Sequence, residues 1–105
     1  MTYEAIVEKM REIIKEKDVS GIQEHLAYQF NITGEGEGIF YLEVSEGKVH
    51  VEPYEYYDRH VIFTCDADSL FKIIQGKLDP IKAVEEQKLM FEGDIEKALR
   101  LQAFI

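Results

Sequence analysis

The first apolar residues of the chain recur with the period of an amphipathic helix. They are Ile6, Val7, Met10, Ile13 and Ile14. Charged residues fill most positions between them, so one apolar stripe would run along such a helix. Thr2 stands where an N-cap is expected, and Asp18 to Gly21 ends the pattern. The stripe predicts either a face packed on the core or a face that binds a partner helix.

Between residues 26 and 65 the apolar period changes to two, which is typical of β-strands. The alternating segments are 26–32, 40–44, 49–51 and 61–65. Residues 33–38 and 45–48 are short and contain glycine, as in hairpin turns, and Pro53 suits a strand end. Because the connections are short, we predict an antiparallel meander of four strands with one buried face.

The last forty residues combine helix signals with one more strand. Residues that can cap helix N-termini are Asp66, Asp79 and Asp94. Gly76 can close the first of these helices, and Pro80 suits the first turn of the second. Lys88 to Glu92 is strand-like, with Leu89 and Phe91 on one face. We therefore predict an α+β fold, a five-stranded mainly antiparallel sheet with helices packed on one face.

Length and charge narrow the functional classes. At 105 residues the chain is expected to form a single domain, residues 1–105. Its net charge of −9 argues against nucleic acid as a partner and against tight binding to anionic membranes. The longest apolar run, Ile39 to Leu42, is too short for stable membrane insertion, and the N-terminus is too charged for a signal peptide. The single cysteine, Cys65, cannot form an internal disulfide, so we expect a cytoplasmic protein.

Candidate catalytic and metal-binding motifs fail on inspection. Gly34 to Gly38 holds two glutamates and precedes a strand, so it is interpreted as a hairpin turn and not as a phosphate loop. Asp66 to Ser69 begins like a calcium loop, but the later loop positions do not match. His25, His50 and His60 lack the spacing of a zinc site, and His50 and His60 are expected to face solvent. We predict no metal and no cofactor.

Nucleophilic catalysis also lacks a signature, since no Gly-x-Ser-x-Gly elbow is present. Cys65 falls on the apolar side of its strand, which indicates an inert buried thiol. Glu85 and Glu86 are interpreted as solvated charge and not as an acid–base pair. Tyr54, Tyr56 and Tyr57 form the densest aromatic cluster. They predict either rings packed on the sheet or a contact surface, which would be a homodimer interface or a pocket rim.

The order of helix, strand and turn signals in the last forty residues resembles that of the sterol carrier protein 2 (SCP-2) family of lipid carriers. The likeness runs from Phe30 to Leu101 and is densest at Val61 to Cys65 and at Gly76-Lys77-Leu78-Asp79-Pro80. The chain departs from the family pattern at Glu85 and at Glu86-Gln87. The resemblance implies a five-stranded sheet with helices over one face and an apolar tunnel between them. It also implies binding of sterols, fatty acids, fatty acyl-CoAs or phospholipids.

We therefore expect a domain that binds and transfers lipids without catalysis. The expected wall residues are Phe30, Ile32, Phe40, Leu42, Phe63, Phe71, Ile74, Val84, Phe91 and Leu99. The alternative is an interaction module whose apolar groove binds a partner helix or an enzyme, and a hydrolase or acyl-transfer enzyme is a third possibility. The last helix, Asp94 to Leu101, is expected to close the cavity, with Leu99 inward and Glu96, Lys97 and Arg100 in water. Residues 103–105 would form a flap.

Overall fold

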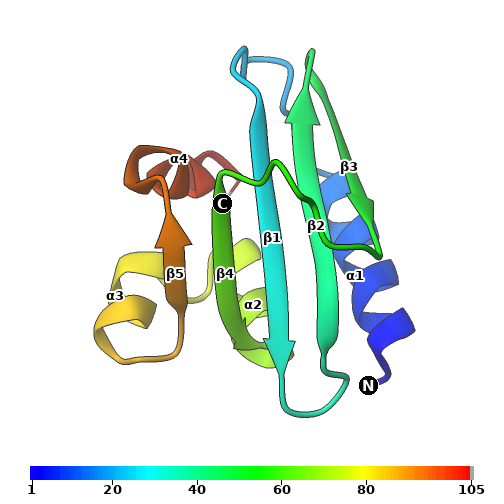
Figure 1. Cartoon of the computed structure of the whole chain (residues 1–105), viewed down its shortest axis with the longest axis vertical. Helices are drawn as coiled ribbons and strands as arrows, with labels where there is room; N and C mark the ends of the chain where they lie inside the picture. The colour runs from blue at the N-terminus through cyan, green and yellow to red at the C-terminus, as the bar shows by residue number, and fades with distance from the viewer. Residues whose placement is uncertain (105) are drawn as a thin grey trace.

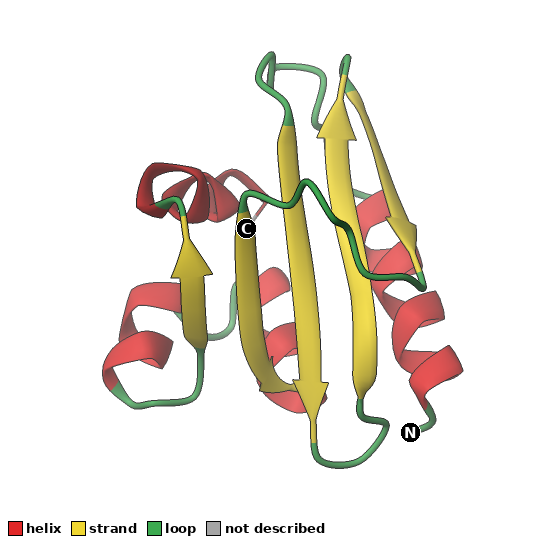
Figure 2. Cartoon of the chain, viewed as in Figure 1, coloured by secondary structure: helices red, strands yellow, loops and turns green. Residues whose placement is uncertain are grey.

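We analysed a computed structural model of the chain, which describes residues 1–104 and the side chains of residues 1–102. The side chains of the predicted flap, residues 103–105, lie outside this part. Five strands form one sheet among the described residues (Figures 1 and 2). In chain order the elements are α1 (Tyr3–Lys15), β1 (Leu26–Thr33), β2 (Gly38–Ser45), β3 (Lys48–Glu52), β4 (Val61–Asp66), α2 (Ala67–Ile74), α3 (Pro80–Glu85), β5 (Met90–Gly93), α4 (Ile95–Leu99) and the 3₁₀-helix η1 (Arg100–Phe104).

The strand order is β3-β2-β1-β4-β5, and within residues 1–104 only the pair β1–β4 is parallel. This confirms the five-stranded, mainly antiparallel sheet, but the predicted four-strand antiparallel meander is wrong at its last step. After β3 the chain does not turn back beside its neighbour. Residues 53–60 instead cross the face of the sheet opposite α1 and α2, and they deliver β4 to the free edge of β1 (Figure 1).

The crossing segment is bonded to the central strand. The backbone N–H of His60 donates to the carbonyl of Ala27 at 2.8 Å, and the backbone N–H of Tyr56 donates to Gln29 Oε1 at 3.2 Å. Ala27 and Gln29, which point away from the helices, are therefore buried. Strand β1 is covered on both faces, by helices on one side and by this segment on the other.

The core lies between the sheet and helices α1 and α2. The stripe of α1 packs on it, since Ile6, Met10 and Ile14 are almost fully buried. On the sheet, Phe30 stacks against Phe40 and Phe63 at centroid distances of 5.2 and 5.5 Å. The helix stripe is thus used for packing, the first of its two interpretations. Of the helices in the described residues, none has the length and apolarity that a membrane crossing requires.

The predicted caps are confirmed. The side chain of Thr2 accepts a hydrogen bond from the N–H of Ala5, and Asp66, Asp79 and Asp94 cap α2, α3 and α4 in the same way. Glu46 and Gly47 have φ values of 53° and 74°, the two positive values of a tight hairpin turn. The fifth strand begins at Met90, two residues later than predicted.

Candidate functional site

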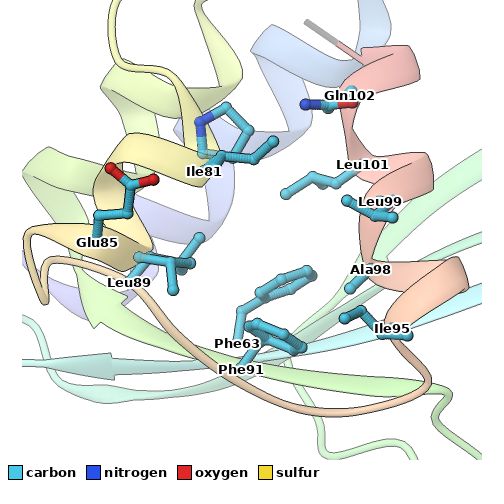
Figure 3. A pocket seen from close by; sticks show the side chains of 12 residues that line it. Phe63, Ile81, Glu85, Leu89, Phe91, Ile95, Ala98, Leu99, Leu101 and Gln102 are labelled. Atoms are coloured by element: carbon cyan, nitrogen blue, oxygen red, sulfur yellow. The ribbon is translucent and has the colours of Figure 1, made fainter.

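An apolar groove of about 300 Å³ lies at the edge of the sheet that β5 forms (Figure 3). Helix α3 forms one wall, α4 and η1 form the facing wall, and β4 and β5 form the floor. The lining residues are Phe63, Pro80, Ile81, Val84, Glu85, Leu89, Phe91, Ile95, Ala98, Leu99, Leu101 and Gln102. Ten of these twelve are apolar, so the groove offers a surface for hydrocarbon rather than for polar chemistry.

Local sequence signals determine where the two helices of the groove walls begin. Asp79 and Pro80 start α3 immediately beside the groove. Gly93 then ends β5 with a φ of 124°, a conformation that L side chains rarely adopt, and Asp94 starts α4. Because β5 is short and lies between α3 and α4 in the chain, the two helices lie at its two ends (Figure 1).

The rim of the groove leaves large apolar side chains in contact with solvent. Ile81 is 48% exposed, Ile95 is 59% exposed and Leu99 is 46% exposed. By contrast, the lining residues Leu89, Leu101 and Phe63 are almost fully buried. Exposed apolar residues gathered around a concavity, unlike scattered ones, indicate a binding surface.

Two polar residues border this apolar surface from opposite walls. Glu85 projects from α3, and Gln102 projects from η1 (Figure 3). Glu85 was interpreted from the sequence as solvated charge, and it is exposed, but it also belongs to the groove. None of the described lining residues is basic.

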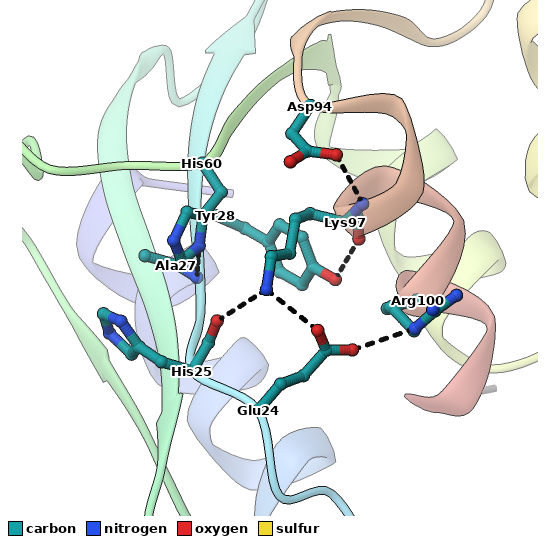
Figure 4. Close-up of polar contacts among 8 residues, drawn as sticks. All are labelled: Glu24, His25, Ala27, Tyr28, His60, Asp94, Lys97 and Arg100. Atoms are coloured by element: carbon teal, nitrogen blue, oxygen red, sulfur yellow. Dashed lines mark hydrogen bonds and ion pairs between the residues drawn. The ribbon is translucent and has the colours of Figure 1, made fainter.

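The wall formed by α4 is fixed to the start of β1 by an ionic cluster (Figure 4). Lys97 Nζ lies 2.8 Å from Glu24 Oε2, and Arg100 Nε lies 2.9 Å from Glu24 Oε1. The hydroxyl of Tyr28 donates to the carbonyl oxygen of Lys97 at 2.6 Å. The hydrogen bond from Lys97, together with the nearby Arg100, lowers the pKa of Glu24.

This cluster corrects one prediction. Lys97 was expected to face water, but its side chain is only 25% exposed because it turns toward Glu24 and β1. Leu99 was expected to face ligand or core, and it lines the groove while remaining half-exposed.

The predicted wall residues fall into two groups. Phe63, Val84, Phe91 and Leu99 come together in the groove. Those that lie in the buried core between the sheet and α1 or α2 are Phe30, Ile32, Phe40, Leu42, Phe71 and Ile74. Phe71 also borders a separate, polar depression, where Lys9 Nζ lies 4.4 Å from its ring centroid. The closed tunnel implied by the family resemblance remains a prediction.

Several groove residues were absent from the predicted wall: Pro80, Ile81, Glu85, Leu89, Ile95, Ala98, Leu101 and Gln102. A signal for part of this set was present, because Ile81, Val84 and Glu85 follow the i, i+3, i+4 spacing of one helix face. Leu101 and Gln102 could not be identified in this way, since η1 is a 3₁₀-helix with a different period.

A second polar cluster lies on the sheet face opposite the helices. Glu43 Oε2 lies 2.6 Å from His25 Nε2, and Glu43 Oε1 lies 3.1 Å from His50 Nε2. The Tyr56 hydroxyl donates to Glu43 at 2.7 Å, which raises the pKa of Tyr56 to about 12 and lowers the pKa of Glu43. Within the described residues no group of three or more histidine, cysteine or acidic side chains could hold a metal ion.

His60 differs from its predicted role. It was expected to face solvent, but its Nδ1 accepts a hydrogen bond of 3.0 Å from the N–H of Ala27, at the junction of the crossing segment with β4. Burial, followed by the nearby Lys97, lowers the pKa of His60.

The remaining candidates are structural. Cys65 is buried, and burial raises the pKa of its thiol to about 12, which agrees with an inert residue. Tyr56 packs its ring 4.8 Å from Tyr41, as predicted for rings on the sheet. Tyr54 is 64% exposed and Tyr57 is 92% exposed, so the contact surface, as a homodimer interface or a pocket rim, stays a prediction.

The sequence pattern of the SCP-2 sterol transfer family matches residues 7–105. The chain is also similar to hydroxysteroid dehydrogenase-like protein 2 from Mus musculus, with 36% identity over 78 residues, 71% of this chain and 16% of that protein. The Xenopus tropicalis protein of the same name is 33% identical over 81 residues, 74% of this chain and 19% of that protein. The chain therefore spans less than a fifth of the length of these relatives.

Several solved structures share the fold. Sterol carrier protein 2 like 2 from Aedes aegypti superposes with a TM-score of 0.70 at 21% identity, covering 97% of this chain and 94% of that one. Sterol carrier protein 2 from Aedes aegypti in complex with palmitate gives a TM-score of 0.69 at 22% identity, covering 99% of this chain and 94% of that one. On the family match and these relatives, the chain belongs to the SCP-2 sterol transfer family.

Proposed function

We propose that this domain binds and transfers lipids without catalysing a reaction, and that the hydrocarbon part of the lipid lies in the groove between α3 and α4. The observation that carries the proposal is the composition of the groove, in which ten of twelve lining residues are apolar. Burying each methylene of a lipid chain against such a surface contributes about 0.8 kcal/mol. Family membership and the palmitate complex of a relative with the same fold support the same conclusion.

The proposed binding surface starts from Phe63, Val84, Phe91 and Leu99, the predicted wall residues that meet in the groove. The hydrocarbon chain of a lipid would lie between the rings of Phe63 and Phe91 on the floor and the aliphatic side chains of the facing helices. A groove without a dedicated polar constellation selects by area and shape, so we expect several chain types to bind.

The chain-length dependence of affinity tests this proposal. Uncharged n-alkanols of eight to twelve carbons should displace a fluorescent apolar probe, with the dissociation constant falling about fourfold for each added methylene. Native mass spectrometry of gently purified protein should also show retained lipid. Equal affinities for octan-1-ol and dodecan-1-ol would contradict the proposal.

A pair of variants locates the binding surface. Leu99→Asp places a charge on the groove wall, and it should weaken dodecan-1-ol binding about tenfold because the charge opposes burial of the chain. The side chain is half-exposed, so the variant should still fold. Met90→Asp is the matched control, because Met90 is 61% exposed next to Phe91 in β5 but does not line the groove. If both variants bind like the parent, the groove is not the lipid site.

A second candidate function is docking of an amphipathic helix from a protein partner into the same groove. The half-exposed side chains Ile81, Ile95 and Leu99 favour it, since they resemble the anchors of a helix-binding groove. The curated relatives are much longer than this chain, and a neighbouring domain could supply such a helix. A protein that retains no lipid and binds no alkanol would favour this function.

A further inference from the structure

Chemical selection at the groove depends on the few polar groups around it. Glu85 on α3 is the one charged side chain among the described lining residues, and Gln102 on the facing wall supplies an amide (Figure 3). Glu85 is exposed, so it lies where the polar end of an amphiphile would meet water. The head of a ligand whose chain fills the groove would therefore meet a carboxylate on one side and an amide on the other.

The basic residues near the groove are engaged elsewhere or lie outside its lining. Lys97 and Arg100 both pair with Glu24, on the side of α4 that faces β1. Lys88 Nζ lies 3.3 Å from Glu86 Oε1. A carboxylate head in the groove would thus face Glu85 without a neighbouring lysine or arginine in the lining.

Lys77 and Lys82 add no positive charge to the lining of the groove. Lys77 lies in an adjoining depression that shares Pro80 and Gln102 with the groove, but Asp79 lies in the same depression with the opposite charge. Lys82 is exposed on α3 and is not a lining residue.

We propose that the groove selects amphiphiles with an uncharged, hydrogen-bond-donating head, such as a hydroxyl group, over those with a carboxylate head, and that Glu85 is the residue that determines this preference. This inference rests on the proposed lipid-binding function. An ionised carboxylate is only an acceptor, and so is the side chain of Glu85, so the two repel and cannot bond. A hydroxyl head can donate to Glu85, and it can also bond to the amide of Gln102.

The test compares two ligands of equal chain length at pH 8 and low ionic strength. Dodecan-1-ol and dodecanoate should each compete against an uncharged fluorescent probe, below their aggregation concentrations. The parent protein should bind the alcohol at least about threefold more tightly. Glu85→Gln should bring the two affinities together by strengthening dodecanoate binding, and Glu85→Lys should reverse the preference. Added salt should reduce the difference in the parent.

Glu86→Gln is the matched control. It removes the same formal charge one residue away, at a side chain that pairs with Lys88 and does not line the groove. It should leave the ratio of the two affinities unchanged. If it shifts the ratio as much as Glu85→Gln does, the overall negative charge of the chain is responsible and the assignment to Glu85 is overturned.

The outcomes separate this inference from the function beneath it. Equal or tighter binding of dodecanoate by the parent overturns the head-group preference and leaves lipid binding standing. If neither ligand binds to the parent, both the proposed function and the preference are overturned.

Discussion

Gly93 is the residue that decides whether β5 can pass into α4. Its φ is 124°, and a Cβ at this position would lie 2.3 Å from the carbonyl oxygen of His60. We expect Gly93→Ala to lower the free energy of unfolding by about 1–3 kcal/mol through backbone strain. The clash with main-chain atoms should lower it further. The measurement is the midpoint of urea unfolding.

Gly47 provides the control for that substitution. It also has a positive φ, 74°, but a Cβ there would meet no atom within 4 Å. Gly47→Ala should therefore cost only the left-handed conformation, about 1–2 kcal/mol. If the two variants lose equal stability, the close approach to His60 does not matter.

His60 gives the fold a pH dependence. Its pKa is lowered in the folded chain, so the unfolded chain binds the proton first as pH falls below about 6.5. Stability is then fully present above that pH and is lost as pH falls through the folded pKa. We expect His60→Asn, which can still accept from the N–H of Ala27 but does not titrate, to flatten the fall in unfolding free energy between pH 7 and pH 5.

His50→Asn is the comparison for this experiment, since His50 is a half-exposed histidine on the neighbouring part of the sheet. If His50→Asn flattens the profile as much as His60→Asn does, the effect is not specific to the histidine that bonds to Ala27. A profile of His60→Asn that is as steep as the parent would show that another group causes the loss.

At the scale of elements, α4 is the wall of the groove that is attached by charge. Glu24, just before β1, pairs with Lys97 of α4 and with Arg100, which caps α4 and begins η1 (Figure 4). We expect Glu24→Gln to raise amide hydrogen-exchange rates in α4 and η1 severalfold, because the helix opens more often without these pairs. Exchange in α1 should stay at the parental rate.

Glu8→Gln is the matched variant, because it removes an ion pair with Arg11 within α1. It should leave exchange in α4 unaltered. Equal protection of α4 in the parent and in Glu24→Gln would mean that other contacts, such as the Tyr28 hydrogen bond to Lys97 and the packing of Leu101, hold the wall in place without these ion pairs.

The sequence predicted most elements correctly because their signals are local. The side chains of Asp66, Asp79 and Asp94 cap helices through bonds to backbone groups three residues away, so spacing alone reveals them. The parallel pairing of β1 with β4 is a long-range choice. Nothing in residues 53–60 distinguishes a segment that turns back from one that crosses the sheet, so the meander was wrong.

The groove was predicted only in part for a related reason. Phe63, Val84, Phe91 and Leu99 were identified, but Phe30 and Phe40 carry the same apolar signal and pack in the core. Hydrophobicity along a chain indicates which residues avoid water. It does not indicate whether another residue or a ligand covers them, and that depends on how closely helices approach the sheet.

At the scale of the whole molecule, the helices and the crossing segment bury the strands of the sheet to different extents. Helices α1 and α2 cover one face of β1, β2 and β4, and the crossing segment covers the other face of β1, whereas β5 is exposed along its length (Figure 2). The proposed lipid site therefore lies at the margin of the sheet, where α3 and α4 pack less completely. A ligand there would complete the packing of the least buried part of the fold.

The parallel neighbour of β1 also sets a condition on synthesis. Tyr28 pairs with Val61, so one edge of the central strand stays open until residues far along the chain have left the ribosome. During that interval the emerging chain presents a long apolar strand with unpaired backbone groups, the kind of edge that recruits other chains. Ribosome-bound chains in which β3 has emerged but β4 has not should accordingly bind chaperones. Chains in which β4 and α2 have also emerged should release them.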